Sequence, residues 1–249
     1  MSWVLLRGLT REARHWGTLP QQLAALPGAG QVVTLDLRGN GVFHAQPSPA
    51  CVRHMVDFAR RQLQAQGVAP PWQLLAMSLG GMVATDWAQQ HPQEVSRLVL
   101  INTSMRPFSP ITQRLRPGNW PALALLAARW HNADPTERTI HRLTCNNTSS
   151  READIAAWVH IRQTAPVSTG NAGRQLLAAA RFSSGPQAPS CPTLLLSSNA
   201  DRLVNPRCSQ RVAEAWQAAH QRHPWAGHDL PHDDAGWVCQ RIGHWLAGS

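Results

Sequence analysis

The chain changes character abruptly in Trp72-Gln73-Leu74-Leu75-Ala76-Met77-Ser78-Leu79-Gly80-Gly81-Met82-Val83, and Ser78 marks the change. The run of residues before Ser78 is short and mostly apolar, as in a strand that is buried on both faces. The residues after it begin with small side chains and continue in a helical pattern. A strand that leads directly into a helix is the repeating unit of an α/β sheet, so this stretch indicates the fold class.

Ser78 stands where such a turn places a reactive group. In a nucleophile elbow, a serine occupies a sharp, strained turn between strand and helix, and its neighbours must be small because bulky side chains would collide. The usual pattern is G-x-S-x-G, and here Ala76 replaces the first glycine. The positive end of the following helix then points toward the serine Oγ. The stretch predicts Ser78 as a nucleophile, with an ordinary strand-to-helix turn as the alternative.

On both sides of this stretch, short apolar runs alternate with helical patterns. Residues such as Val52, Met55, Val56, Ala59 and Leu63 recur at helical spacing and mark one buried face. The alternation predicts an α/β protein with a mostly parallel central sheet flanked by helices. The predicted strands are Trp3–Leu9, Gln31–Leu37, Trp72–Met77, Arg97–Asn102, Thr193–Ser197 and, more weakly, Gln221–Trp225.

Residues 105–185 interrupt this rhythm with helical patterns and no convincing strand pattern. One helix is expected to start at Asp134, as N-cap, with Glu137 at the third helical position. Another is expected to start at Ser149, with Glu152 reaching back to it as in a capping box. We therefore expect a core of residues 1–104 and 186–249, with residues 105–185 inserted as a helical cap.

An acidic residue, Asp201, follows the predicted strand Thr193–Ser197, in a loop closed by Pro206. Catalytic groups of parallel sheets gather at the carboxyl ends of the strands, so Asp201 is a candidate site residue. The alternative is a loop aspartate that caps the next helix.

A histidine, His228, follows the last predicted strand and a glycine. A lone histidine is often a surface or core residue, and His232 is the nearest competitor for a role in the site. Asp229, Asp233 and Asp234 compete with Asp201, but they lie too close to the histidine in sequence to reach its far ring nitrogen. The chain order Ser78, Asp201, His228 favours a triad of nucleophile, acid and general base.

These residues make the whole chain resemble an α/β-hydrolase-fold serine hydrolase of the esterase and lipase type with a helical cap. Three further stretches match: Asp36-Leu37-Arg38-Gly39-Asn40-Gly41, Leu98-Val99-Leu100-Ile101-Asn102-Thr103 and Leu5-Leu6-Arg7-Gly8-Leu9-Thr10. In the last stretch Arg7 replaces the histidine that the family usually has there. The resemblance implies an oxyanion hole formed by the backbone N–H groups of Leu79 and Leu9.

The resemblance implies cleavage of carboxylic esters through an acyl-enzyme, without a metal or organic cofactor. C–C bond hydrolases, thioesterases, acyltransferases and amidases on the same fold stay open, as does a non-catalytic small-molecule binding protein. Specificity is expected to come from the cap. Its large apolar residues are Trp120, Leu123, Leu126, Trp130, Trp158 and Phe182. Arg106 and Arg162 are the candidates for holding an acidic substrate.

The composition narrows the partners. The net charge is +9, and all 23 basic residues are arginines. The arginines are scattered and no nucleic-acid motif accompanies them, so we expect a small-molecule ester substrate and no nucleic acid. The longest apolar stretch, residues 121–128, is far shorter than a membrane span. We expect no membrane association and a cytoplasmic location, and a homodimer stays open. The odd number of cysteines, five, without a CxxC pattern, predicts unpaired thiols and no zinc site.

Overall fold

A computed structural model of the protein describes residues 1–248 and contains one sheet of six parallel strands in the order β2-β1-β3-β4-β5-β6. All the predicted strands are present, so the predicted fold class is confirmed, and their ends shift by at most four residues. The strands are β1 (Ser2–Leu6), β2 (Gln31–Leu35), β3 (Trp72–Met77), β4 (Val95–Ile101), β5 (Thr193–Ser198) and β6 (Ala219–His223).

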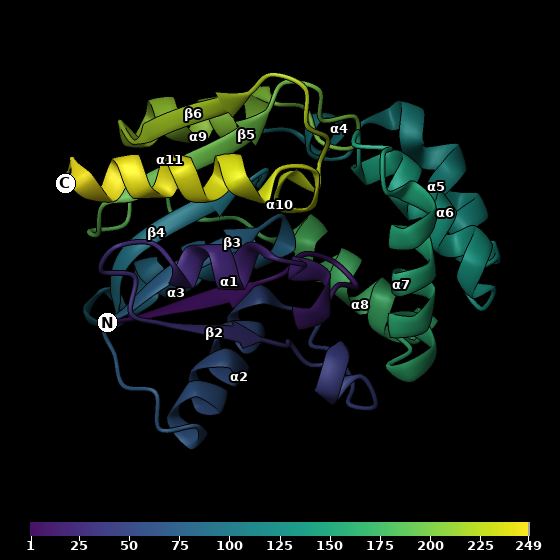
Figure 1. The fold of residues 1–249 in the computed structure, drawn as a ribbon, viewed down its shortest axis with the longest axis horizontal. Helices are drawn as coiled ribbons and strands as arrows, with labels where there is room; N and C mark the ends of the chain where they lie inside the picture. Colours follow the sequence, from purple (N-terminus) through teal and green to yellow (C-terminus); the bar gives the residue numbers. More distant parts are fainter. Residues whose placement is uncertain (249) are drawn as a thin grey trace.

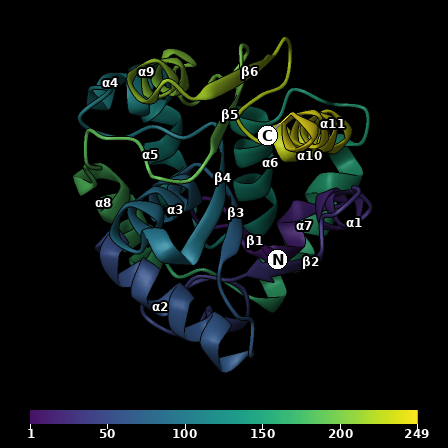
Figure 2. The same ribbon diagram turned by 90° about the vertical axis from the view of Figure 1, so that its left-hand side faces the viewer.

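Helices cover both faces of the sheet, as Figure 2 shows in a view along the strands. Helices α2 (Val52–Ala65), α3 (Leu79–Gln90) and α9 (Arg207–Trp216) pack on one face. Helices α1 (Leu19–Ala24) and α11 (Ala235–Ala247) pack on the other. The short helices are η1 (Ala13–Trp16), η2 (Gly41–Phe43), η3 (Pro92–Glu94), η4 (Pro117–Asn119) and α10 (Leu230–Asp233).

The two helical layers explain why the central strand β3 is apolar at every position except Gln73. In β3, Leu74 and Ala76 belong to the core cluster with α2, α3 and α9. Leu75 and Met77 belong to the cluster with α1 and α11. Because successive side chains of a strand point to opposite faces, a strand between two helical layers needs an apolar residue at nearly every position.

Five α-helices, with the short helix η4 among them, lie between β4 and β5, at the end of the sheet where the strands finish (Figure 1, right). We call them the helical insertion: α4 (Ile111–Arg114), α5 (Trp120–Ala128), α6 (Ala133–Thr144), α7 (Arg151–Thr164) and α8 (Thr169–Arg181). Arg106 and Ser183 form a parallel β-bridge near the predicted limits of the insertion. That this segment is a separate cap stays a prediction.

Both predicted helix starts in the insertion are wrong by one or two residues. Helix α6 begins at Ala133, after Asn132, and the carboxylate of Asp134 instead pairs with Arg138, one turn later, at 2.9 Å. Helix α7 begins at Arg151, after Ser150, and Glu152 pairs with the same Arg138 at 2.8 Å. Both carboxylates therefore pair with Arg138 of α6 instead of capping the start of a helix.

Two further sequence expectations concern the cysteines and membrane insertion. The five cysteines are unpaired, as predicted. Among residues 1–248, the helices all fall short of the length and apolar character that a membrane span requires.

Candidate active site

Ser78 lies between β3 and α3 in a backbone conformation that side chains rarely adopt, with φ of 54° and ψ of −118°. The turn is tight because the start of α3 packs directly against the end of β1. A Cβ atom on Gly80 would lie 2.3 Å from the carbonyl oxygen of Leu6, which excludes any larger residue without backbone movement. The strain and the close packing together hold the Ser78 side chain above the end of the sheet.

The structure brings Ser78, His228 and Asp201 together from three loops. The Nε2 atom of His228 lies 3.1 Å from Ser78 Oγ, and its Nδ1 atom lies 2.7 Å from Asp201 Oδ2. The other oxygen of Asp201 accepts hydrogen bonds from the backbone N–H groups of Leu203 and Val204, at 2.8 and 2.9 Å. Both His228 and Asp201 are buried. The arrangement suits proton transfer from Ser78 to a histidine that a fixed carboxylate orients.

The charge of Asp201 also sets the basicity of His228. Burial lowers the pKa of His228, but the negative charge of Asp201 and its hydrogen bond outweigh burial, so the pKa lies above its ordinary value. A raised pKa makes the imidazole a better proton acceptor near neutral pH.

The competing residues have other partners. His232 Nε2 lies 3.2 Å from Asp154 on α7. Asp233 accepts hydrogen bonds from the backbone of Asn146 and Gly227, and Asp234 caps α11 through the N–H of Trp237. These carboxylates fix loops, which leaves Asp201 as the acid in contact with His228.

The sequence analysis missed Asn102 and Thr103 as supports of the site. The Nδ2 atom of Asn102 donates to the carbonyl oxygen of His228 at 2.8 Å, from a residue with φ of 43°. The hydroxyl of Thr103 donates to the carbonyl oxygen of Ser78 at 2.9 Å. Both residues follow β4, the strand between those that carry Ser78 and Asp201. Their position after a central strand was a signal, but nothing in the sequence pairs Asn102 with His228, 126 residues away, or Thr103 with Ser78.

Arg7, which stands where the family usually has histidine, makes a buried ion pair with Asp229. Its guanidinium binds both carboxylate oxygens, at 3.0 and 2.6 Å, and it also lies 4.7 Å above the ring of Trp16. Burial raises the pKa of Asp229, but the charge and hydrogen bonds of Arg7 outweigh it and lower that pKa to about 2. The pair links the loop after β1 directly to the residue that follows His228.

The two predicted oxyanion donors flank Ser78. Leu79 is the first residue of α3, where a backbone N–H has no acceptor within the helix. Leu9 follows Gly8, and a Cβ on Gly8 would lie 3.1 Å from Ser78 Cβ, so the backbone here approaches the serine closely. Their role as an oxyanion hole stays a prediction.

Two cavities of about 110 Å³ each meet at Ser78 and share Leu9 and Leu203 in their walls. The first also contacts His228 and is closed by apolar residues of α5 and α6. The second lies toward α4 and α8. A substrate bound at Ser78 therefore has one space for each of the two groups attached to its reacting carbonyl. In the first cavity the apolar residues of the insertion and the loop after α5 are Leu123, Leu126, Trp130, Ile140 and Leu143.

The predicted specificity residues divide into two groups. Leu123, Leu126 and Trp130 line the first cavity. Trp158 instead packs against both His141 and His232, with ring centroids 5.4 and 4.9 Å away. Phe182 joins the core cluster on the α3 face, and Trp120 is exposed.

Arg114 is a buried arginine in the wall of the second cavity. Its Nη2 atom donates to the carbonyl oxygen of Ala179 at 2.5 Å, whereas Nε and Nη1 have no hydrogen-bond partner among residues 1–248. Burial, and then the positive charge of Arg106, lower the pKa of Arg114. An anionic group in this cavity would stabilise the guanidinium.

The arginines proposed from the sequence for this task are engaged elsewhere. Arg106 donates to the carbonyl oxygens of Arg181 and Phe182. Arg162 pairs with Glu137 at 2.6 Å and lies 4.3 Å above the ring of Trp130. Both hold the insertion together rather than face the cavities that meet at Ser78.

Comparison with known protein families and relatives agrees with the fold described above. Residues 4–235 match the model of the alpha/beta hydrolase fold family. The chain is 31% identical over 251 residues to a protein of Klebsiella pneumoniae (strain 342) named "Putative carbamate hydrolase RutD". The aligned region covers 93% of this chain and 86% of the relative. A pimeloyl-[acyl-carrier protein] methyl ester esterase of Chromobacterium violaceum is 36% identical over 92 residues, or 37% of this chain and 34% of the relative.

Solved structures share the fold at low sequence identity. A thermophilic esterase from Thermogutta terrifontis superposes with a TM-score of 0.76 at 23% identity, over 100% of this chain and 90% of that one. An enol-lactonase from Burkholderia xenovorans LB400 superposes with a TM-score of 0.78 at 18% identity, over 99% of this chain and 91% of that one.

Proposed function

The chain belongs to the alpha/beta hydrolase fold family and is a hydrolase of that superfamily, and on this premise we propose that it cleaves carboxylic esters with Ser78 as nucleophile. The observation that carries the proposal is the continuous chain of contacts from Ser78 Oγ through His228 to Asp201, at 3.1 and 2.7 Å. Removal of a proton from Ser78 requires a base at this distance and in this orientation.

The reaction follows from these contacts. Ser78 Oγ attacks the ester carbonyl carbon while His228 Nε2 takes the hydroxyl proton, and Asp201 stabilises the imidazolium. The N–H groups of Leu9 and Leu79 bind the negative oxygen of the tetrahedral intermediate, and each donor contributes about 2.7–4 kcal/mol. His228 then protonates the departing alcohol oxygen. Water, deprotonated by His228, attacks the acyl-enzyme and releases the acid with Ser78 regenerated.

The helical insertion, residues 105–185, acts in this proposal as a cap that selects substrates. Leu123, Leu126 and Trp130 close the first cavity, which supports a small apolar group on that side of the carbonyl. The unpaired nitrogens of buried Arg114 support an acidic group on the other side. The preferred substrate is then a small ester that also carries a carboxylate.

A carbamate is the second candidate substrate, because a relative that covers 93% of the chain is named for carbamate hydrolysis. The carbonyl of a carbamate is attacked in the same way and would leave a carbamoyl group on Ser78. Ester and carbamate hydrolysis therefore need the same three residues and differ in the rate of the second step.

The test uses the wild type, Ser78→Ala and Ser96→Ala, a control at the opposite end of β4. Each is given p-nitrophenyl esters of increasing acyl length, a p-nitrophenyl carbamate of matched size, and a fluorophosphonate probe. We expect ester turnover and probe labelling in the wild type and the control, and a loss of at least about 10⁴-fold in Ser78→Ala. Labelling without ester turnover would transfer the proposal to another substrate, and absence of labelling would contradict it.

A further inference from the structure

Three donor side chains outside the candidate active site converge where the insertion meets the core. His141 lies at the end of α6, Cys145 directly follows that helix, and His232 lies on α10. One ligand atom of each lies within 4.8 Å of the corresponding atoms of the other two. None of the three takes part in the reaction proposed above.

His141 is the most unusual member of this group. Its side chain is 1% exposed, and neither ring nitrogen has a hydrogen-bond partner among residues 1–248. A buried neutral imidazole carries one donor and one acceptor, and both are normally satisfied. The nearest carboxylate oxygen, Asp154 Oδ2, is 3.6 Å from Nε2, beyond hydrogen-bond distance. The site therefore contains an unused nitrogen lone pair that faces a thiol and a second imidazole.

We infer that His141, Cys145 and His232 form a zinc-binding site that fastens the helical insertion to the core. The cysteine spacing predicted no zinc site, but it could not reveal this group because two of its three members are histidines. A thiol and two imidazoles are the side chains that Zn²⁺ prefers. In a tetrahedral zinc site, neighbouring nitrogen and sulfur ligands lie about 3.3–3.6 Å apart, so these side chains need to close by only about 1 Å.

The carboxylate of Asp154 lies beside both imidazoles. Its Oδ2 atom lies 3.6 Å from His141 Nε2 and 3.2 Å from His232 Nε2. A carboxylate next to ligating histidines fixes their rings and raises their basicity. When Zn²⁺ binds, Cys145 loses its proton to solvent and binds as thiolate. The double charge of the ion is then balanced by the thiolate and the Asp154 carboxylate.

The place of the site determines what the metal would do. Asp229 donates its backbone N–H to the carbonyl oxygen of Thr144 at 2.7 Å, so the end of α6 already contacts the loop of His228. Bound zinc would add metal–ligand bonds between the end of α6 and His232 on α10. His232 lies four residues after His228. The bound ion would hold the wall of the first cavity and the catalytic histidine in a fixed relation.

The experiment measures metal binding directly and so does not depend on the proposed function. Metal-free full-length protein is titrated with Zn²⁺ against a chromogenic chelator and with Co²⁺, whose thiolate complexes show a charge-transfer absorption. We expect one ion per chain and a cobalt–thiolate absorption in the wild type. Zinc should also raise the melting temperature of the wild type.

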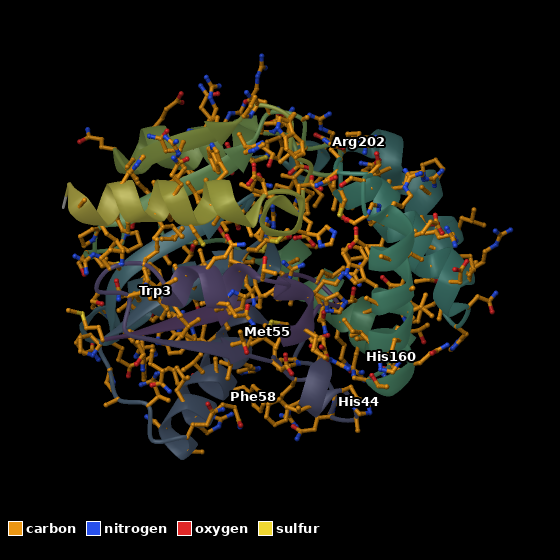
Figure 3. All side chains as sticks on the ribbon, in the orientation of Figure 1. Trp3, His44, Met55, Phe58, His160 and Arg202 are labelled. Carbon is orange, nitrogen blue, oxygen red and sulfur yellow. The ribbon has the colours of Figure 1, made fainter. Side chains whose placement is uncertain are left out.

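The variants assign the ligands. Cys145→Ser should abolish the cobalt–thiolate absorption, and His141→Asn or His232→Asn should weaken zinc binding by at least tenfold. The matched controls are Cys239→Ser, a buried thiol on α11, and His160→Asn, an exposed histidine on α7 that Figure 3 labels. Circular dichroism verifies that each variant folds. Absence of stoichiometric binding in the wild type, or binding that survives Cys145→Ser with its thiolate absorption, would overturn the inference.

Discussion

At the scale of single residues, two opposing effects on His228 make the pH dependence of the reaction informative. Burial lowers its pKa, and the larger combined effect of Asp201 raises it. Because only the neutral imidazole accepts the Ser78 proton, we expect kcat/KM for an uncharged ester to rise with pH, with a midpoint above about 6.5. Stopped assays in constant ionic strength buffers measure this profile.

The companion variant Asp201→Asn separates the two effects. Without the carboxylate, the effect of burial on the His228 pKa is no longer outweighed by Asp201. The midpoint should therefore move to lower pH while the maximal rate falls by about 10⁴-fold, as in other serine triads. A midpoint that stays in place would mean that another group controls the profile.

At the same scale, we propose that Arg114 selects substrates that carry an anionic group. We expect the wild type to favour the monomethyl ester of a short dicarboxylic acid over the uncharged dimethyl ester, and Arg114→Gln to reverse that preference at least tenfold. The reason is that Arg114 lines the second cavity and its buried guanidinium has two nitrogens without a hydrogen-bond partner among residues 1–248. The measurement is the ratio of kcat/KM for the two esters.

Arg106→Gln is the matched control for this prediction. Arg106 also donates to carbonyl oxygens at the end of α8, but it is exposed. Its substitution should leave the ratio close to that of the wild type. If both variants lost the preference for the monomethyl ester equally, the cause would be a general effect of positive charge rather than a contact between Arg114 and the substrate.

At the scale of elements, the close contact between α3 and β1 requires a residue without a side chain at Gly80. We expect Gly80→Ala to destabilise the protein by about 3 kcal/mol or more, because the new Cβ would lie 2.3 Å from Leu6 O and 2.6 Å from Arg7 O. Activity should fall with stability, since α3 carries the turn of Ser78. Urea denaturation measures the change.

The opposite result is expected for Gly173, an exposed residue inside α8 around which a Cβ would meet nothing within 4 Å. Gly173→Ala should stabilise the protein by about 0.5–1 kcal/mol, because alanine loses less backbone freedom in a helix. If both glycine variants behaved alike, close packing at Gly80 would not be the cause.

At the scale of the whole molecule, the Arg7–Asp229 pair joins residues 222 positions apart. We expect Arg7→Met or Asp229→Asn alone to cost about 3–5 kcal/mol, because each leaves one buried charge without a partner. The double variant should cost clearly less than the sum of the two. Chemical denaturation of the four proteins forms the double-mutant cycle, and additive costs would show that the pair contributes no coupling.

Further contacts join the insertion to the loops of the sheet. Arg202, labelled in Figure 3 beside α5, donates to the carbonyl oxygen of Cys145 and to the side chain of Asn146. Since Arg202 directly follows Asp201, the loop after α6 is tied to the acid of the candidate triad as well as to the loop of His228.

The sequence by itself determined the sheet, the elbow and the order of the candidate triad. Each depends on local information: apolar residues at nearly every position of β3, Gly80 and Gly81 after Ser78, and polar residues in the loops after β5 and β6. Since parallel strands end at the same edge, that order already indicated that Ser78, Asp201 and His228 would meet. The structure brings them into contact, and their catalytic role stays a prediction.

Only the tertiary structure decided which charged and polar side chains face one another. No sequence pattern links Arg7 to Asp229, Asn102 to the carbonyl of His228, or His232 to the pair His141 and Cys145. Arg114 is one of 23 arginines and differs from the others through its burial beside the second cavity. The physical reason is that such contacts depend on strand register and helix packing, which bring distant residues within a few ångströms only after the chain has folded.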